Sequence, residues 1–316
     1  MKKGIKTVFT VIGKILLIVL SFAVVLTCVA IIYNKIQCKK EESFWIDPPG
    51  QMVEVDGHRM HIYSEGEGDH TIVFLSAWGD VSPYNNFLPL CRELSSDARV
   101  VILERFGYGL SDIVDEERTF DKILEEDREG LVKAGIEGPY VLAPHSIAGP
   151  ESILWAQKYP SEVEGIVGMD ISVPAYRDEY ATQKVSEDFL EKIFQETGLV
   201  RFVYGNIMAK YGKPAGEADK MELAIACRHG NNKNKISEYE HLVEALDEIV
   251  SMPLPTVPTI QYIAMQDSDP IWESGHQDLV DASENGKLIK LDCGHYVYWY
   301  EQERIVRDIK EFLDSL

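Results

Sequence analysis

Short apolar runs alternate with amphipathic stretches along most of the chain. The stretches at 120–135 and 150–160 have helical spacing, and residues 52–63 predict a β-hairpin with its turn at Asp56-Gly57. Runs that are apolar throughout are typical of strands in a parallel sheet covered by helices on both faces. The pattern therefore predicts an α/β architecture, with sheet strands at 71–76, 100–103, 140–143, 166–169, 260–265 and 287–291.

The alternation of strands and helices is interrupted between Asp170 and Pro258. This segment is polar and rich in helical patterns, so we expect residues 172–257 to form a helical lid over a core made of 45–171 and 258–316. Apolar side chains recur in the lid at helical spacing, and they either pack it onto the core or line a substrate pocket. These side chains are Phe189, Phe194, Phe202, Val203, Tyr204 and Met208.

A run of 19 uncharged residues, 15–33, lies near the N-terminus. As a helix it is about 28 Å long, which is enough to cross the hydrocarbon core of a bilayer. A cleaved signal peptide is the alternative, but its apolar region is usually shorter. We therefore expect residues 1–40 to be a single-pass membrane anchor. Four lysines precede the run and three follow it, which favours a cytoplasmic N-terminus and an extracytoplasmic location for residues 45–316.

Acidic residues dominate the rest of the chain. The 316 residues carry a net charge of −21, and because residues 1–40 contain seven Lys and no acidic residue, the remainder has a net charge of −28. A surface of this sign repels phosphate backbones, so we expect no nucleic-acid partner. The five cysteines form no CxxC pair and no Cys/His cluster, and no Walker loop or GxGxxG sequence is present. We therefore expect neither a metal nor a cofactor.

The sequence YVLAPHSIAGP at 140–150 places a serine between a strand and a helix. A serine hydroxyl needs exposure, orientation and a base to act as a nucleophile, and a tight strand-to-helix turn supplies the exposure. Such a turn requires small residues two positions before and after the serine. Ala148 meets this requirement, whereas Pro144 stands where glycine is usual. The start of the next helix offers backbone N–H groups to an oxyanion beside Ser146.

His295 is the candidate base. It follows Gly294 on a loop between the last strand and an amphipathic terminal helix, from which it can reach the serine over the sheet edge. We expect the other seven histidines to be surface residues. A carboxylate must orient such a base. Asp170, Asp267 and Asp269 all follow sheet strands, where this architecture gathers its site, so their positions leave all three open.

From about residue 50 to the C-terminus, these motifs resemble those of the α/β-hydrolase family. Five motifs in the right order carry the resemblance. They are FLSAWG at 74–79 for the strand-HG loop, ERFGYGLSD at 104–112 for the D-x-G-x-G-x-S turn, PHSIAG at 144–149 for the nucleophile elbow, MQDSDPIW at 265–272 for the acid loop and CGHYVYW at 293–299 for the histidine loop.

The resemblance implies a Ser-acid-His triad with an oxyanion hole made of two backbone N–H groups. The family's usual acid loop follows the penultimate strand, so Asp269 is the first choice for the acid and Asp170 the alternative. The oxyanion donors implied are the N–H groups of Ile147 and Trp78. The second of these lies in a loop where Ser-Ala replaces His-Gly, so that Ala77 must tolerate a backbone posture that glycine ordinarily takes.

The expected reaction is transfer of an acyl group to water, with ester hydrolysis as the first choice. In the resembling family an aspartate nucleophile would indicate dehalogenase or epoxide chemistry, and the serine argues against both. A prolyl-aminopeptidase-like peptidase is the alternative enzyme, in which Glu187, Glu191 and Glu196 would hold a substrate ammonium group. Pro144 and Ala77 keep open an inactive, membrane-tethered binding module. The expected partners are a small acyl substrate and the membrane, and the oligomeric state stays open.

Overall fold

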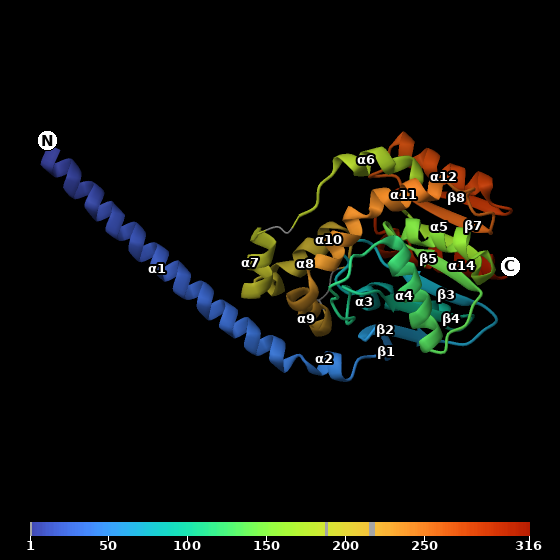
Figure 1. Cartoon of the computed structure of the whole chain (residues 1–316), viewed down its shortest axis with the longest axis horizontal. Coiled ribbons are helices and arrows are strands. Elements are labelled where there is room, and N and C mark those ends of the chain that lie inside the picture. Colours follow the sequence, from blue (N-terminus) through green and yellow to red (C-terminus); the bar gives the residue numbers. More distant parts are fainter. Residues whose placement is uncertain (1, 187–188, 215–218) are drawn as a thin grey trace.

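One mixed sheet forms the centre of the body in the computed structural model, which describes residues 2–186, 189–214 and 219–316 (Figure 1). The strand order is β1-β2-β4-β3-β5-β6-β7-β8. β2 runs antiparallel to both of its neighbours, and the pairs from β4 onward are parallel. The strands are β1 (Gln51–Val55), β2 (His58–Glu65), β3 (Thr71–Leu75), β4 (Arg99–Glu104), β5 (Tyr140–Pro144), β6 (Val163–Met169), β7 (Thr259–Ala264) and β8 (Gly286–Leu291).

Alternate strand residues point into two separate cores. In β3, Ile72 and Phe74 pack on one side with α3 and α14, whereas Val73 and Leu75 pack on the other with α4 and α5. The expected strands, the expected hairpin and the covering of both faces by helices are therefore confirmed. The helices of this body are α3 (Pro83–Leu94), α4 (Phe120–Lys133), α5 (Ala148–Lys158), α12 (Pro270–Ala282), α13 (Val297–Tyr300) and α14 (Gln302–Leu313), with a 3-10 turn at Pro160–Glu162.

The segment between β6 and β7, residues 172–257, is called the cap segment below. Its described residues form helices without a strand, and α11 packs against α5 through the buried Leu242, Ala245 and Leu246. In Figure 1 it covers the end of the sheet where β5 stops and α5 begins. Its elements are a 3-10 turn (Pro174–Tyr176), α6 (Arg177–Thr182), α7 (Phe189–Thr197), α8 (Val200–Lys210), α9 (Lys220–His229), α10 (Lys233–Glu240) and α11 (Leu242–Val250).

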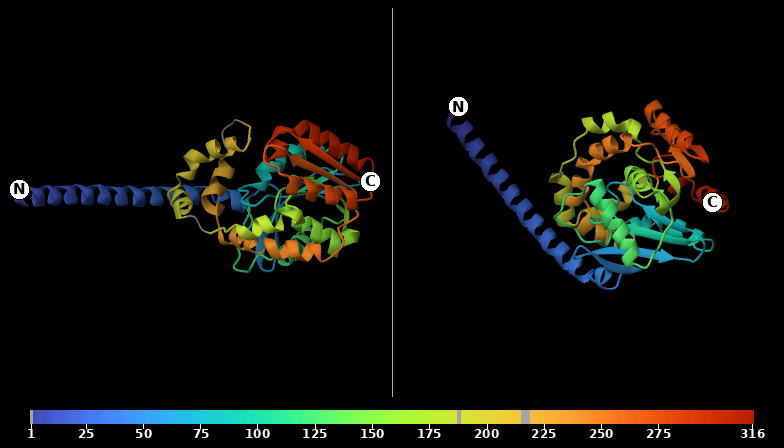
Figure 2. Two further views of the ribbon diagram at one scale, coloured as in Figure 1. Left: turned by 90° about the horizontal axis from the view of Figure 1, so that it is seen from above. Right: turned by 45° about the vertical axis from the view of Figure 1, so that its right-hand side comes forward.

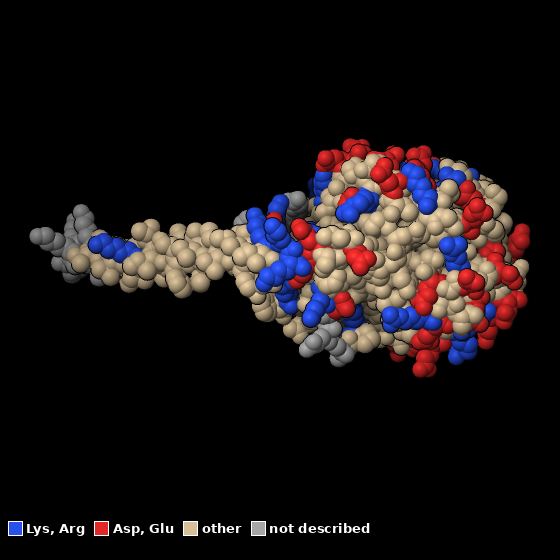
Figure 3. Space-filling view, turned by 90° about the horizontal axis from the view of Figure 1, so that it is seen from below, with Lys and Arg blue, Asp and Glu red and all other residues tan. Residues whose placement is uncertain are grey.

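The N-terminal helix α1 (Lys2–Lys40) projects far out of the body, and a short helix α2 (Ser43–Ile46) joins it to β1 (Figures 1 and 2). By length and composition α1 is able to cross a membrane. In both views of Figure 2 the cap helices α7 and α8 lie on the side of the body next to α1. Figure 3 shows Lys and Arg gathered where α1 meets the body and acidic side chains spread over the rest of that face.

Candidate active site

Ser146 sits at the turn between β5 and α5. Its φ of +56° lies in the left-handed region, which costs a residue with a side chain on the order of 1–3 kcal/mol and is held by its surroundings. The N–H of Gly149 donates to the Ser146 carbonyl at 2.9 Å, and the N–H of Ser172 donates to it at 2.8 Å. Pro144 is accommodated as the last residue of β5, paired with Leu75 of β3. The tight turn expected around the serine is therefore present.

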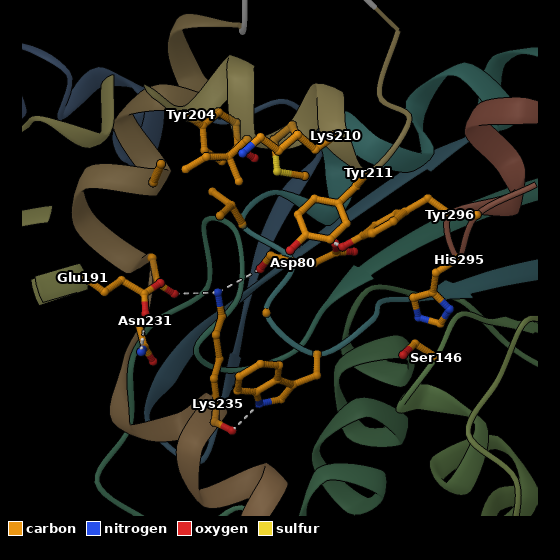
Figure 4. Close-up of a pocket in the computed structure, with 18 of the residues that line it drawn as sticks. Asp80, Ser146, Glu191, Tyr204, Lys210, Tyr211, Asn231, Lys235, His295 and Tyr296 are labelled. Atoms are coloured by element: carbon orange, nitrogen blue, oxygen red, sulfur yellow. Dashed lines mark hydrogen bonds between the residues drawn. The ribbon is translucent and has the colours of Figure 1, made fainter. Parts of the chain in front are cut away.

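His295 lies on the loop between β8 and α13, beside Ser146 at one end of a pocket (Figure 4). Its Nδ1 is 2.6 Å from Oδ2 of Asp170, a buried residue that directly follows β6. The other carboxylate oxygen, Oδ1, accepts hydrogen bonds from the N–H of Ala264 and the indole N–H of Trp272, both at 2.9 Å. With the Nδ1 proton donated to this fixed carboxylate, Nε2 keeps the lone pair that a base requires.

A second histidine supports the loop that carries His295. The ring of His145, the residue before the serine, lies against the His295 ring at a centroid distance of 4.6 Å, with the two ring planes tilted by 38°. Its Nε2 lies 3.1 Å from the His295 carbonyl, which can only accept, so His145 carries its proton there. Burial, together with the neighbouring His295, lowers the pKa of His145 well below its ordinary value. His145 is therefore a neutral support between the two loops.

Asp269, the first choice for the acid, is engaged elsewhere. It caps the N-terminus of α12, where Oδ1 accepts from the N–H groups of Ile271 at 2.8 Å and Trp272 at 2.9 Å. Oδ2 accepts from the Tyr176 hydroxyl at 2.9 Å, and these donors, Trp272 first, lower the pKa of Asp269. Asp followed by Pro is a common helix start, which is the signal that could have separated this residue from an acid loop. Asp267 is exposed at the edge of the pocket.

Each loop that carries an expected oxyanion donor also contains an N–H group that is hydrogen-bonded within the loop. The N–H of Ala148 donates to His145 O and that of Asp80 donates to Ala77 O, whereas no acceptor within the described chain is recorded for the N–H of Ile147 or Trp78. The left-handed backbone position in this loop falls on Gly79, with φ +80°, and not on Ala77. The alanine therefore meets no conformational strain of the kind expected from the missing glycine.

The pocket that holds Ser146 and His295 has a volume of about 1140 Å³ and extends under the cap segment (Figure 4). Phe194 of α7 and Val203, Tyr204 and Met208 of α8 line it. These four expected cap residues therefore face the pocket. Phe202 differs, because it is 77% exposed and does not line the pocket. The side chain of Phe189 lies outside the described set.

Two buried charges that the sequence did not single out, Asp80 and Lys235, also line this pocket. The Lys235 ammonium donates to the carbonyls of Asp80 and Gly230 at 2.8 Å and of His229 at 3.3 Å, and burial lowers its pKa to about 8. Burial raises the pKa of Asp80 to about 6, even though Lys235 and the Asn86 amide oppose the shift. Oδ2 of Asp80 has no hydrogen-bond partner within the described residues.

The three glutamates proposed to hold a substrate ammonium group lie apart from one another or outside the described chain. Glu191 lines the pocket and accepts from the Asn231 amide at 2.9 Å. Glu196 is exposed, and its carbonyl accepts from Asn34 of α1 at 3.1 Å. Glu187 lies outside the described residues. Among the described side chains, no group of three or more His, Cys, Asp or Glu residues is arranged to hold a metal ion.

Solved structures share this architecture. An epoxide hydrolase from Bacillus megaterium superposes with a TM-score of 0.66 at 19% identity, covering 84% of this chain and 100% of its own. An enol-lactonase from Burkholderia xenovorans superposes with a TM-score of 0.59 at 18% identity, covering 84% of this chain and 100% of its own. Cfl2 from Burkholderia cenocepacia has a TM-score of 0.67 at 20% identity, over 83% of this chain and 94% of its own. At these identities, the likeness establishes the α/β-hydrolase fold.

Sequence similarity extends over the whole length, including α1. The uncharacterised protein YbdG of Bacillus subtilis is 31% identical over 325 residues, which cover 98% of either chain. The chain belongs to the YbdG family of α/β-hydrolase-fold proteins. A second Bacillus subtilis protein, the uncharacterised YqjL, is 27% identical to 41% of this YbdG-family chain, and the match covers 49% of YqjL. A search against models of known protein families finds no match.

Proposed function

We propose that this YbdG-family chain is a membrane-anchored serine hydrolase that cleaves carboxylic esters. The observation that carries the proposal is the Ser146 turn beside His295, whose Nδ1 lies 2.6 Å from the buried Asp170. In this reading Ser146 attacks the acyl carbon, His295 takes the hydroxyl proton and Asp170 stabilises the imidazolium. Asp170 replaces Asp269 as the proposed acid because its carboxylate is the one in contact with His295.

The N–H groups of Trp78 and Ile147 are the proposed oxyanion hole. In this proposal the two N–H groups, which have no acceptor among the described residues, stabilise the negative charge of a tetrahedral intermediate. His295 then returns its proton to the leaving alcohol, and water attacks the acyl-enzyme in a second round with the same base. The free enzyme and the acid and alcohol products complete the cycle without a cofactor step.

The identity of the nucleophile favours esters over epoxides. A serine that opens an epoxide forms an ether, which water at neutral pH does not cleave, so the enzyme would be trapped. A serine that attacks an ester or lactone forms an acyl-enzyme, which water does cleave. Of the structural neighbours, the enol-lactonase therefore has the chemistry closer to this site.

Labelling with a serine-reactive fluorophosphonate tests the triad. We expect the full chain in detergent to be labelled and the Ser146→Ala variant to remain unlabelled. Ser172→Ala is a matched control, because this buried serine lies close to Ser146 in the fold and should not affect the attachment site. Labelling that persists in Ser146→Ala, or no labelling of the wild type, would favour the inactive binding module instead.

The proposed anchor is α1, with residues 45–316 outside the cytoplasm and the cap segment as a lid that sets substrate choice. The exposed apolar surface of α1 would be unstable in water and suits a bilayer. After a carbonate wash of cell membranes, we expect the intact chain in the pellet and accessible to protease in spheroplasts. Release of the chain into the supernatant would contradict the proposed anchor. Protection from protease until the cells are lysed would mean that residues 45–316 lie in the cytoplasm.

A further inference from the structure

The cap helices α7 and α8 have an outer face that is apolar and exposed. Leu190 is 65% exposed, Leu199 43% and Phe202 77%, although each is a residue that soluble surfaces carry sparingly. Phe202 and Val203 are successive residues of α8, about 100° apart around the helix, and Val203 lines the pocket whereas Phe202 does not. Leu190, Leu199 and Phe202 do not line the pocket, and we call these three exposed apolar residues the outer cap face.

Hydrogen bonds fix these helices to the end of α1. The Asn34 amide donates to the carbonyls of Gln195 and Glu196 at 3.0 and 3.1 Å, which caps the last turn of α7. Arg201 of α8 makes a bidentate pair with Glu41, both contacts at 2.7 Å, and its Nε donates to the Asn34 side chain at 3.3 Å. The cap helices are therefore held to α1 directly and not only through the body.

These attachment points lie where α1 leaves the hydrocarbon. The uncharged run ends at Tyr33, Asn34 is the next residue, and Glu41 is about 12 Å further along the helix axis. The interfacial layer of a bilayer leaflet is about 5–8 Å thick. Lys35, Lys39 and Lys40 are exposed in the same stretch, where they would meet lipid headgroups. In the anchored arrangement proposed above, the ends of α7 and α8 that contact Asn34 therefore lie next to the membrane surface.

Exposed apolar side chains also lie at the opening of the pocket. Phe194, Ile207 and Tyr211 all line the pocket, yet they remain 39%, 42% and 54% exposed. They therefore form part of the pocket's outer rim. A substrate chain that slides over this rim from a bilayer stays in contact with apolar side chains on its way to Ser146.

We propose that the outer cap face lies on the bilayer that holds α1, and that the pocket takes esters with a long apolar chain from that bilayer. The contacts of Asn34 with α7 and of Glu41 with Arg201 of α8 favour the membrane over other occupants, because they place these cap helices beside the proposed membrane helix. The inference rests on the anchor and the ester chemistry proposed above. It adds the class of substrate and its direction of entry.

Photo-crosslinking tests the surface without requiring activity. The full chain, reconstituted in vesicles of phosphatidylcholine and phosphatidylglycerol, carries p-benzoylphenylalanine in place of Phe202 or, as a control, of Val132. Val132 is 68% exposed on α4, which lies away from α1 in Figures 1 and 2. We expect a lipid adduct by mass spectrometry from position 202 and none from position 132. No adduct at 202, equal adducts at both positions or a crosslink to a second chain overturns the proposal.

Kinetics test the substrate class. We expect Phe202→Glu and Leu199→Glu to lower turnover of a long-chain ester in vesicles about tenfold or more, because a charge replaces apolar contact with the bilayer. Turnover of a soluble short-chain ester should stay unchanged, and Val132→Glu should change neither. Equal losses on both esters overturn the route from the bilayer. If the wild type hydrolyses neither ester, the proposed function is wrong. The crosslinking experiment still tests whether the outer cap face lies on the bilayer.

Discussion

At the scale of single residues, Asp170 is held more firmly than an exposed carboxylate could be. It occupies a left-handed backbone position, with φ +49°, directly after β6. Donors from Ala264, Trp272 and His295 occupy its two oxygens from three separate elements. A carboxylate held in this way fixes both the tautomer and the ring orientation of the histidine. Asp269 instead accepts hydrogen bonds from the N–H groups at the start of α12.

Asparagine substitutions distinguish the two carboxylates. We expect Asp170→Asn to lower kcat by about 10³–10⁴-fold, because an amide no longer selects the Nδ1–H tautomer or stabilises the imidazolium. Asp269→Asn should keep kcat near that of the wild type, since asparagine is also a good helix cap. The measurement is steady-state turnover of a soluble ester. A collapse of Asp269→Asn alone would restore it as the acid.

Asp80 predicts a dependence of stability on pH. Its pKa is about 6 in the folded protein and about 3.8 when unfolded, so between these values the folded state keeps a proton that the unfolded state releases. The contribution of Asp80 to the free energy of unfolding is therefore lost as the pH rises from about 4 to 6, and it does not return above pH 6. A shift of about two pKa units corresponds to about 3 kcal/mol.

The Asp80→Asn variant removes this charge. At pH 8 we expect it to unfold at a higher temperature than the wild type in the same detergent, with the difference shrinking as the pH is lowered toward 4. Asp112→Asn is a control at a half-exposed carboxylate outside the pocket. A variant that is less stable at pH 8 would mean that the Asp80 charge is well compensated in the fold.

The positions of Ser146 and His295 could be predicted from the sequence because each depends on local order: a strand, a sharp turn and a helix. The carboxylate that contacts His295 could not, because Asp170 and Asp269 both follow strands and only the folded loops decide which one reaches the imidazole. Asp80 and Lys235 gave no signal in the sequence. Their importance comes from burial, which depends on a cap helix that returns about 155 residues later to cover the loop after β3.

At the scale of elements, the turn at Ser146 depends on close packing of α5 against the loop after β6. A Cβ added to Gly149 would lie 2.6 Å from the carbonyl oxygen of Ser172 and 2.7 Å from Cβ of Ile171. Both atoms belong to or adjoin the backbone that follows Asp170, so they cannot move without shifting the acid. The first turn of α5 thus couples the position of the nucleophile to that of the carboxylate.

Gly149→Ala tests this packing. We expect a loss of about 1–3 kcal/mol in the free energy of unfolding together with a fall in kcat, because relief of the clash displaces the acid loop. Gly205→Ala in α8 is the matched control. It has nothing within 4 Å of the added atom and should gain about 1 kcal/mol in helix propensity. Unchanged stability and kcat in Gly149→Ala would show that the loop after β6 moves to accommodate the added Cβ without cost.

The strands of the sheet could be predicted because each buried run carries its own signal of length and apolar composition. The arrangement of the cap helices could not, because their amphipathic patterns fit either packing on the core or lining a cavity. The structure has both: Leu242 and Leu246 of α11 pack on the core, and Val203 and Met208 of α8 line the pocket. Helical spacing indicates that a face is apolar but not what it meets.

At the scale of the whole molecule, side-chain contacts join α1, the proposed anchor, to the cap segment and the body. Glu41→Ala removes the partner of Arg201 and leaves every trypsin site in place. We expect cleavage by trypsin in the cap segment to become about tenfold faster in membranes, since a lost charge-assisted pair is worth about 1.5–3 kcal/mol. Asp247→Ala, which breaks the exposed pair with Arg177 on α6, should leave this rate unchanged. Equal rates in all three proteins would show that the body alone holds the cap.

The unbroken course of α1 from Lys2 to Lys40 has a consequence for how the protein responds to its lipid surroundings. A helix whose apolar length exceeds the local bilayer thickness tilts to bury it. Asn34 and Glu41 are hydrogen-bonded to the cap helices. A tilt of α1 therefore turns the cap segment as well, which it would not do if a flexible linker joined the two. The acyl-chain length of the host lipids then sets the angle at which the cap meets the surface. In the membrane arrangement proposed above, bilayer thickness would thereby control substrate entry without changing the contacts of Ser146, His295 and Asp170.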